Sequence, residues 1–466
     1  MNISGWRSER LAIGLITCTA AVLYIYCLTS QSLWMDEGFS VFMGRTDAAS
    51  FWRFVRGGEV NMVLYYGLFR IWLHFGTSEL WIRFFSAIWG VATIPVVYAL
   101  GKRLCGGVSG GVAALLFAAH PSEVAYAQEV RGYSIAVFLI AVSCLLFLRS
   151  VEESKSWRWA GYVTFSALAV YAHLFTIFVI AAQWAWLLLF LRSRMWKLSI
   201  LTSGAALALS LVPLISIVLV HYHQAADWIP PLTVSGFLEV WSFLTLPKWR
   251  ILLYLSLWIV AVGTSIFGRQ HWANQWQFGF TACWLFLPVA LTLGISLYKP
   301  MLAPRFLLVC LPASVLLATC GLTRLPRSVA TVAFGVLAIA SFTSVLSYYR
   351  HLGWKEDWRG ATAYLVSHCE AGDGVVIVPA YGRFTFDYYR EISPGPRKVL
   401  VYGQLNPSKP FLPSGVGHRT WLIISAVGSR LPGMREVLQD LTSNAKPSSS
   451  VLETHHFNSI EVLLVR

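Results

Sequence analysis

The chain has 466 residues, carries a formal net charge of +14, and is 56% hydrophobic but only 12% charged. Soluble domains average about 25% charged residues, so the composition excludes an ordinary soluble protein. A mean hydropathy of +0.61 and 21 tryptophans indicate a polytopic membrane protein instead.

About eleven apolar runs are long enough, or nearly long enough, to cross a membrane as helices, which need about 20 residues. In chain order they are Leu11–Leu28, Trp81–Leu100, Gly107–Ala125, Ser134–Leu148, Trp159–Tyr171, Leu174–Leu191, Leu198–Val220, Ile251–Phe267, Phe278–Leu297, Phe306–Gly321 and Val329–Tyr348. We therefore expect a polytopic α-helical membrane protein with about eleven transmembrane helices. The region Trp159–Leu191 can also be divided into helices in a different way.

The first apolar run has two interpretations. It is longer than the usual apolar core of a signal sequence, and no A-x-A cleavage site follows it. A retained membrane helix is therefore favoured over a cleaved signal sequence. In either case Asp36 lies outside the cytoplasm.

The basic residues indicate the orientation of the chain. If the N-terminus is cytoplasmic and the spans alternate, the inside segments hold 13 Lys and Arg residues and three acidic residues. This asymmetry follows the positive-inside rule, so it predicts a protein of the inner or plasma membrane with no nucleic-acid partner. It also predicts a transmembrane catalytic domain over 1–348, a first outer loop at 29–80, and an extracytoplasmic domain over 349–466.

Two outer loops and the tail have patterns of their own. Residues 64–75 favour a helix in the membrane interface, and a pair of prolines within residues 221–249 prevents a continuous helix there. The tail is predicted to form helices at 357–368 and 433–443, buried strands at 374–380, 398–403 and 421–427, and two closing strands that turn at Asn458–Ser459. Alternating helices and strands indicate a small α/β domain.

The eight cysteines follow no metal-binding spacing, and only Cys369 falls in the tail, so no disulfide is expected there. No glycine-rich nucleotide-binding loop follows a predicted strand. We therefore expect neither a metal nor another cofactor.

Polar residues collect at the outer ends of the predicted helices. They are Asp36, Glu37, His120, Glu123, Gln128, Glu129, Arg131, His173, His221, His223, Asp227, Lys299 and Arg305. Each class has a simpler explanation: the acids end a solvated helix, the cations contact lipid headgroups, and His173 packs with a hydrogen bond. Their convergence on one face of the membrane nevertheless favours a functional site.

The location outside the cytoplasm restricts the chemistry. No nucleotide-activated substrate is supplied there, so an activated donor must arrive on a lipid carrier. Transfer of a sugar from a lipid phosphate needs a carboxylate to accept the proton of the attacking hydroxyl, and cations to stabilise the departing phosphate. The acidic pair Asp36 and Glu37 suits the first role. The second role suits Arg131, Lys299 and Arg305.

A set of short motifs occurs in order along nearly the whole chain. It comprises WMDEGFS (34–40), SELWIRFFSAIWGVATIPVVYALGKRL (78–104), YAQEVRGYS (126–134), YAHLF (171–175), DWIPPLT (227–233), APRFLLVCLP (303–312) and DWRGATAYL (357–365). With these motifs the chain resembles the GT-C superfamily of polyprenyl-phosphate-sugar-dependent glycosyltransferases. It is most similar to the family 39 type, which includes protein O-mannosyltransferases and aminoarabinose-transferase-like proteins.

The resemblance implies an inverting transfer of a hexose or pentose from a polyprenyl-phosphate-linked sugar to an acceptor glycan, lipid or protein. It implies that Asp36 is the general base and Glu37 its support. By the same comparison Arg131 and Arg305 would hold the donor phosphate, and Glu129 and His173 would line the pocket. The full predicted substrate-binding set is Tyr65, Gln128, Glu129, Arg131, His173, Lys299 and Arg305. Metal dependence varies in the superfamily. The chain departs from the pattern at NMVLYY (61–66) and at Gly132, where relatives often carry proline.

Two other classes compete with this interpretation. A transporter or lipid flippase usually places polar residues at the membrane midplane on broken helices, often with repeat symmetry, and the sequence has no visible repeat. A receptor with an extracytoplasmic ligand-binding domain would leave the acidic pair and the cations of the outer loops unexplained.

Overall fold

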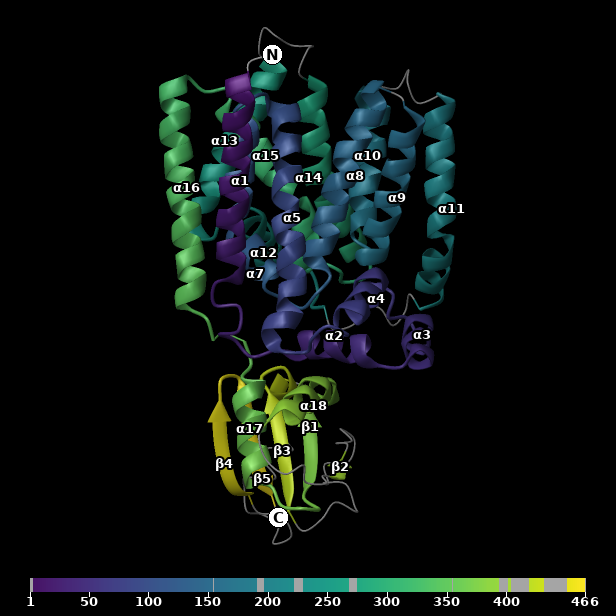
Figure 1. Ribbon diagram of the computed structural model, residues 1–466, viewed down its shortest axis with the longest axis vertical. Helices are drawn as coiled ribbons and strands as arrows, with labels where there is room; N and C mark the ends of the chain where they lie inside the picture. The colour runs from purple at the N-terminus through teal and green to yellow at the C-terminus, as the bar shows by residue number, and fades with distance from the viewer. Residues whose placement is uncertain are drawn as a thin grey trace. The chain divides into compact units, whose positions relative to one another are not determined.

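A computed structural model describes residues 3–153, 155–190, 197–221, 229–267, 275–353, 355–393, 401–403, 419–430 and 451–465. The chain divides into two compact units, whose elements are labelled in Figure 1. The first unit contains Met1–Tyr26, Asp47–Thr77 and Trp81–Tyr349, and the second contains Cys27–Thr46, Ser78–Leu80 and Arg350–Arg466. The acid-bearing start of the first loop therefore folds with the C-terminal part of the chain.

The first unit consists of helices, of which the long ones stand alongside one another as a bundle (Figure 1). In chain order they are α1 (Ile3–Ile25), α3 (Ala48–Arg56), α4 (Val63–Trp72), α5 (Glu79–Cys105), α6 (Ser109–Ala118), α7 (Pro121–Ala127), α8 (Tyr133–Glu153), α9 (Ser156–Ala172), α10 (Thr176–Phe190), α11 (Leu198–Val220), α12 (Val234–Leu244), α13 (Ile251–Phe267), α14 (Gln275–Ser296), α15 (Leu311–Leu322) and α16 (Arg327–Arg350). Two short 3₁₀ helices, η2 (Lys248–Arg250) and η3 (Pro304–Cys310), precede α13 and α15. Each predicted apolar run overlaps a helix.

Seven helices of the described residues are long and apolar enough to cross a membrane. They are α1, α5, α8, α11, α14, η3 taken with α15, and α16. Helices α12 and α13 are bent by 67° and add an eighth if they count as one span. The prediction of a polytopic helical membrane protein is confirmed. Three further helices, α6, α9 and α10, have 10, 17 and 15 residues and are short for a full crossing.

The run Gly107–Ala125 is not one continuous helix, as the sequence analysis assumed. Helix α6 ends at Ala118, and α7 begins at Pro121. The imidazole Nδ1 of His120 accepts a hydrogen bond from the Ser122 N–H at 3.3 Å, which caps α7. A proline at the first position of a helix loses no hydrogen bond, so this sequence favours a new start over continuation.

Two contacts bring α15 close to its neighbours. A side chain at Gly321 would collide with the carbonyl oxygen of Leu257, so this residue allows α15 and α13 to approach closely. A disulfide joins Cys105 at the end of α5 to Cys320 in α15, with 5.1 Å between the Cα atoms. The sequence analysis did not pair these two cysteines.

The first loop contributes two short helices to the first unit. Helix α4 covers most of the predicted interface helix 64–75, but Tyr65, Tyr66 and Phe69 on it are fully buried. Helix α3 instead exposes half of the Trp52 side chain. The aromatic residues of α4 therefore form part of the protein core.

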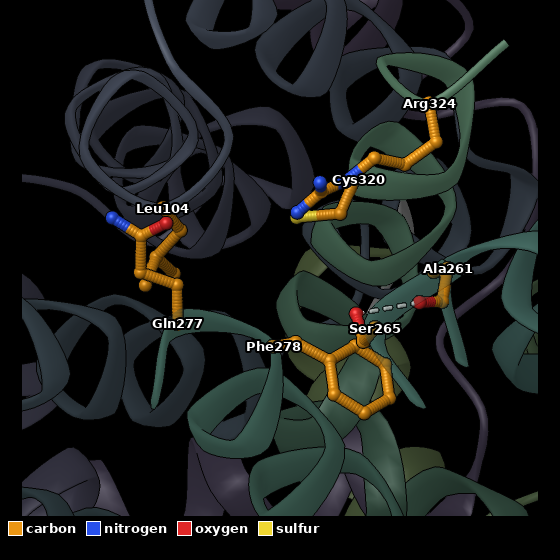
Figure 2. Close-up of a pocket in the computed structure, with 7 residues that line it drawn as sticks. All are labelled: Leu104, Ala261, Ser265, Gln277, Phe278, Cys320 and Arg324. Carbon is orange, nitrogen blue, oxygen red and sulfur yellow. Dashed lines mark hydrogen bonds between the residues drawn. The ribbon is translucent and has the colours of Figure 1, made fainter. Parts of the chain in front are cut away.

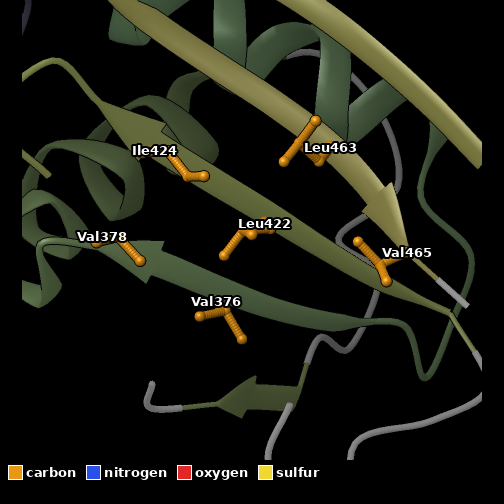
Figure 3. Close-up of a cluster of buried hydrophobic side chains, with 6 residues drawn as sticks. All are labelled: Val376, Val378, Leu422, Ile424, Leu463 and Val465. Carbon is orange, nitrogen blue, oxygen red and sulfur yellow. The ribbon is translucent and has the colours of Figure 1, made fainter. Parts of the chain in front are cut away.

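The second unit is built on a five-stranded mixed sheet in the order β2-β1-β3-β5-β4. Its strands are β1 (Gly374–Val378), β2 (Val401–Gly403), β3 (Thr420–Ser425), β4 (Val451–Phe457) and β5 (Ile460–Val465). Strands β1, β2 and β3 run parallel, whereas β5 is antiparallel to both β3 and β4. Figure 3 shows the cluster of buried side chains on this sheet: Val376, Val378, Leu422, Ile424, Leu463 and Val465.

Three helices accompany the sheet: α2 (Met35–Arg45), α17 (Trp358–His368) and α18 (Arg383–Ile392). The predicted helix 357–368 and the turn at Asn458–Ser459 are confirmed. Helix α18 was not predicted, and the predicted helix 433–443 lies outside the described residues.

Helix α2 packs closely against α18. A Cβ at Gly38 would lie 2.7 Å from the backbone nitrogen of Thr385, nearer than real side chains approach. Phe42 lies against Phe384 with 4.3 Å between ring centroids, and the N–H of Leu33 donates to the hydroxyl of Tyr389 at 2.6 Å. The absence of a side chain at Gly38 therefore fixes the position of α2 in the second unit.

Replacing Gly38 by alanine should lower the free energy of unfolding by about 1–3 kcal/mol, because the added methyl group forces α2 and α18 apart. Thermal unfolding of the purified protein in detergent measures the effect. Gly67→Ala in α4 is the matched control, since nothing lies within 4 Å of a Cβ there. An unchanged melting temperature for Gly38→Ala would contradict the described packing.

Candidate functional site

The acidic pair lies in the first turn of α2, directly after Trp34. The Asp36 side chain is partly exposed, whereas Glu37 is fully buried. Successive residues on a helix are rotated by about 100°, so the two carboxylates face different surroundings. Asp36 is therefore partly accessible to solvent, whereas Glu37 contacts only the protein interior.

Two groups of the second unit contact the Glu37 carboxylate. Its Oε2 accepts a hydrogen bond from the backbone N–H of Trp34 at 3.3 Å. The same oxygen lies 3.5 Å from Nζ of Lys355, whose side chain is also buried. An acceptor at this position binds an otherwise unused N–H of the first turn, so Glu37 stabilises the start of α2.

A third carboxylate lies near the pair. Glu356 is buried, and its Oε2 accepts a hydrogen bond from the indole N–H of Trp358 at 2.7 Å. Burial raises the pKa of Glu356, and the negative charge of Asp36 raises that pKa further. The hydrogen bonds from Trp358 and Ser425 act in the opposite direction. Glu356 therefore lies within electrostatic reach of Asp36.

An arginine connects the segments that carry these residues. Arg359 binds the Glu79 carboxylate through two hydrogen bonds, Nε to Oε1 at 3.0 Å and Nη2 to Oε2 at 2.5 Å. The same Nη2 also donates to the carbonyl oxygens of Thr29 and Gln31. The planar guanidinium suits binding of one carboxylate through two hydrogen bonds. Arg359 therefore anchors the segment that leads into α2.

In the first unit, cations gather around His173. The charges of Arg131 and Arg305 both act on this buried imidazole. The Nη1 of Arg131 donates to the Tyr66 hydroxyl at 3.4 Å, and the Arg305 guanidinium lies 5.9 Å from the ring centroid of Phe306. The structure therefore brings together three of the residues that the sequence analysis selected.

The other selected residues of the first unit have different surroundings. The N–H of Arg131 donates to the carbonyl oxygen of Glu129 at 2.8 Å, so these two lie on one tight turn. Tyr65 stacks on Phe69 with 5.5 Å between ring centroids. Lys299 is partly exposed in the segment between α14 and η3.

Gln128 braces the end of α1. Its Nε2 donates to the carbonyl oxygens of Tyr24 and Tyr26 at 3.2 and 2.8 Å, and its Oε1 accepts from the Tyr348 hydroxyl at 3.0 Å. The last carbonyls of a helix have no partner within the helix. Gln128 therefore ties the end of α1 to α16.

The two departures from the family pattern lie against each other. The N–H of Gly132 donates to Sδ of Met62 at 3.4 Å, and Asn61 Oδ1 accepts from the N–H of Leu174 at 3.2 Å. A Cβ at Gly132 would meet the carbonyl oxygen of Ala172 at 3.0 Å. A proline at 132 would have no N–H to donate, so the changed NMVLYY segment and Gly132 fit together.

The sequence analysis missed Lys355 and Glu356, because nothing in the local pattern places residues before α17 beside α2. The only signal was two charges directly before the DWRGATAYL motif. Two residues of the outer set, His223 and Asp227, lie outside the described residues. Among the described residues no group of three His, Cys, Asp or Glu side chains could hold a metal.

Figure 2 shows a pocket at the end of the bundle where α5 and α15 are joined by the disulfide. It is lined by Leu104, Ala261, Ser265, Gln277, Phe278, Cys320 and Arg324. Its volume of about 10 Å³ has room for about one water molecule. None of the predicted site residues lines it, so it has no bearing on the proposed chemistry.

Comparison with known proteins gives a family match for part of the chain and several similar folds. Residues 64–217 match the family described as dolichyl-phosphate-mannose-protein mannosyltransferase. No curated protein matches the sequence.

Two solved structures of ArnT from Cupriavidus metallidurans are similar to this fold over nearly all of both chains. The apo structure has a TM-score of 0.65 at 13% identity and covers 100% of this chain and 98% of that chain. The structure bound to undecaprenyl phosphate has a TM-score of 0.62 at 13% identity and covers 97% of each chain.

An oligosaccharyltransferase of Archaeoglobus fulgidus, tethered with an acceptor peptide, is also similar. It has a TM-score of 0.51 at 11% identity and covers 83% of this chain and 60% of that chain. These findings agree with the resemblance drawn from the sequence: residues 64–217 are similar to the dolichyl-phosphate-mannose-protein mannosyltransferase family, and the fold is similar to that of ArnT.

Proposed function

We propose that the protein transfers a sugar, with inversion at the anomeric carbon, from a polyprenyl-phosphate donor to a hydroxyl of an acceptor lipid, glycan or protein. The observation that carries this proposal is the partly exposed Asp36 carboxylate beside the buried, ion-paired Glu37. A general base must reach the proton that it accepts. Asp36 is therefore assigned as the base, and Glu37 as its support.

The departing lipid phosphate is assigned to Arg131, Lys299 and Arg305. His173 contributes a further donor. Its Nδ1 accepts from the Phe175 N–H at 3.3 Å, which assigns the proton of the neutral ring to Nε2. This buried Nε2 has no hydrogen-bond partner among the described residues, and buried donors are nearly always satisfied. A phosphate oxygen would satisfy it.

The remaining members of the predicted set are assigned to the substrate-binding region. Tyr65 and Glu129 are proposed to line it. Gln128 contributes by holding the end of α1, since its amide already binds backbone carbonyls and the Tyr348 hydroxyl.

The donor class draws support from the fold. ArnT from Cupriavidus metallidurans has been solved with undecaprenyl phosphate bound, and this chain is similar to it over 97% of its length. A lipid phosphate also suits a site outside the cytoplasm, which the distribution of basic residues predicts.

The proposed topology counts eleven crossings, the eight candidate spans together with the shorter helices α6, α9 and α10. Residues 1–348 are assigned as the transmembrane catalytic domain and residues 349–466 as the extracytoplasmic domain. The N-terminus is placed in the cytoplasm, because the inside segments then carry most of the excess positive charge.

Asp36→Asn should reduce sugar transfer at least about 100-fold, because the amide cannot accept the proton of the attacking hydroxyl. The assay combines purified protein, a cell-envelope extract and a panel of radiolabelled polyprenyl-phosphate sugars, which also identifies the sugar and the acceptor. Asp47→Asn is the matched control, since Asp47 is an exposed acid of the same loop that caps α3. Full activity of Asp36→Asn would remove Asp36 as the base.

Arg305→Ala should weaken binding of the donor lipid about tenfold or more, because a charge-assisted hydrogen bond to phosphate is lost. Equilibrium binding of undecaprenyl phosphate to the detergent-solubilised protein measures the change. Arg327→Ala, at the exposed start of α16, is the control cation. An unchanged affinity for Arg305→Ala would exclude Arg305 from the phosphate site.

A further inference from the structure

The Lys355 ammonium is buried beside the acidic pair. Its side chain is only 5% exposed, and Nζ lies 3.5 Å from Oε2 of Glu37 and 5.7 Å from the ring centroid of Trp34. Removing a buried ion's partner leaves an uncompensated charge, which is strongly unfavourable. Lys355 and Glu37 therefore stabilise each other's charged forms, and the aromatic face of Trp34 adds a cation–π contact.

The position of Lys355 is set by the sheet. Asn458, at the turn between β4 and β5, donates from Nδ2 to the carbonyl oxygen of Lys355 at 2.6 Å. The carbonyl oxygen of Asn458 in turn accepts from the N–H of Asp357 at 2.9 Å. The backbone is therefore fixed on both sides of Glu356. The β4–β5 hairpin in this way sets the position of the Lys355 Cα, from which the side chain extends.

Lys355 acts on Asp36 through Glu37. The Glu37 carboxylate accepts from the N–H of Trp34, which closes the first turn of α2 around Asp36. A carboxylate accepts this hydrogen bond more strongly than a neutral carboxyl group would. Keeping Glu37 ionised therefore keeps the turn closed and the Asp36 side chain in one orientation.

We propose that Lys355 is a positioning residue for the acidic pair, supplied by the segment before α17, which holds Glu37 ionised and thereby fixes the orientation of Asp36. The proposal rests on the assignment of Asp36 as the base. In this proposal the C-terminal part of the chain contributes to catalysis indirectly, by holding the acidic pair in place, and none of its residues needs to touch the substrate.

Other charged groups surround the pair, and one of them opposes Lys355. Glu356 follows Lys355 in the chain, and the charges of Glu356 and Asp36 repel each other. Arg359 of α17 is engaged by Glu79, the Tyr389 hydroxyl of α18 accepts from Leu33, and Arg45 pairs with Glu391 at the far end of α2. The acidic pair therefore has charges of both signs around it, with Lys355 beside Glu37 and Glu356 within electrostatic reach of Asp36.

The first test compares Lys355→Met with Lys355→Arg. Lys355→Met should lower kcat about 10- to 100-fold with little change in KM for the donor, whereas Lys355→Arg should retain most activity because it keeps the charge. Arg45→Met is the matched control, since Arg45 makes the exposed ion pair of the same helix with the C-terminal segment. A kcat of Lys355→Met within twofold of the parent would overturn the proposal.

The second test follows the rate as a function of pH. Loss of a nearby cation disfavours the ionised form of a carboxylate. Because Lys355 holds Glu37 ionised in this proposal, the activity of Lys355→Met should decline on acidification at a higher pH than that of the parent, whereas Lys355→Arg should follow the parent. An unmoved profile for Lys355→Met would contradict the proposal.

The third test separates this proposal from the proposed function. Melting temperatures of Lys355→Met, Glu37→Gln and the double variant form a cycle that measures the coupling of the pair without any activity assay. We expect the double variant to melt at a temperature no lower than that of the less stable single variant. If the two single losses of stability simply added in the double variant, that result would contradict the ion pair. If the coupling holds but Asp36→Asn is fully active, the base assignment fails while the Lys355–Glu37 pair stands.

Discussion

The structure of the acid-bearing helix depends on the compensation of one buried charge. Glu37 is fully buried in α2, and its carboxylate pairs with Lys355 from the C-terminal part of the chain. Removing one partner of a buried ion pair is strongly unfavourable. The pair therefore ties the start of α2 to the segment before α17, within the compact unit that residues 27–46 form with residues 350–466.

The acidic and the cationic residues are held by different physical means. Next to the acidic pair, the contacts that join it to the C-terminal segment are polar: Lys355 to Glu37, Arg359 to Glu79, and Asn458 to the backbone of Lys355. Around His173 the neighbours are aromatic, with the rings of Tyr133, Phe175 and Phe306 at centroid distances of 5.3 to 5.8 Å. Within this aromatic lining the imidazole Nε2 of His173 has no hydrogen-bond partner among the described residues, which suits binding of an anion.

Much of the fold was predictable because its signals are local. Long apolar runs located the helices, short apolar runs located β1 and β3, and the turn at Asn458–Ser459 located the β4–β5 hairpin. Two details were not predicted. The break at His120 depends on a local cap and a following proline within an apolar run, and α18 has a polar sequence that becomes a helix through packing on α2.

The sequence by itself determined the class of the protein, its membrane-spanning character, and the residue types of the candidate site. Hydrophobicity and charge asymmetry are properties of composition along the chain, and they require no knowledge of contacts. Only the tertiary structure decided that Asp36 is partly exposed while Glu37 is buried, and that Lys355 and Glu356 accompany them. Burial and ion pairing join residues distant in the chain, so no local pattern near the acidic pair encodes them.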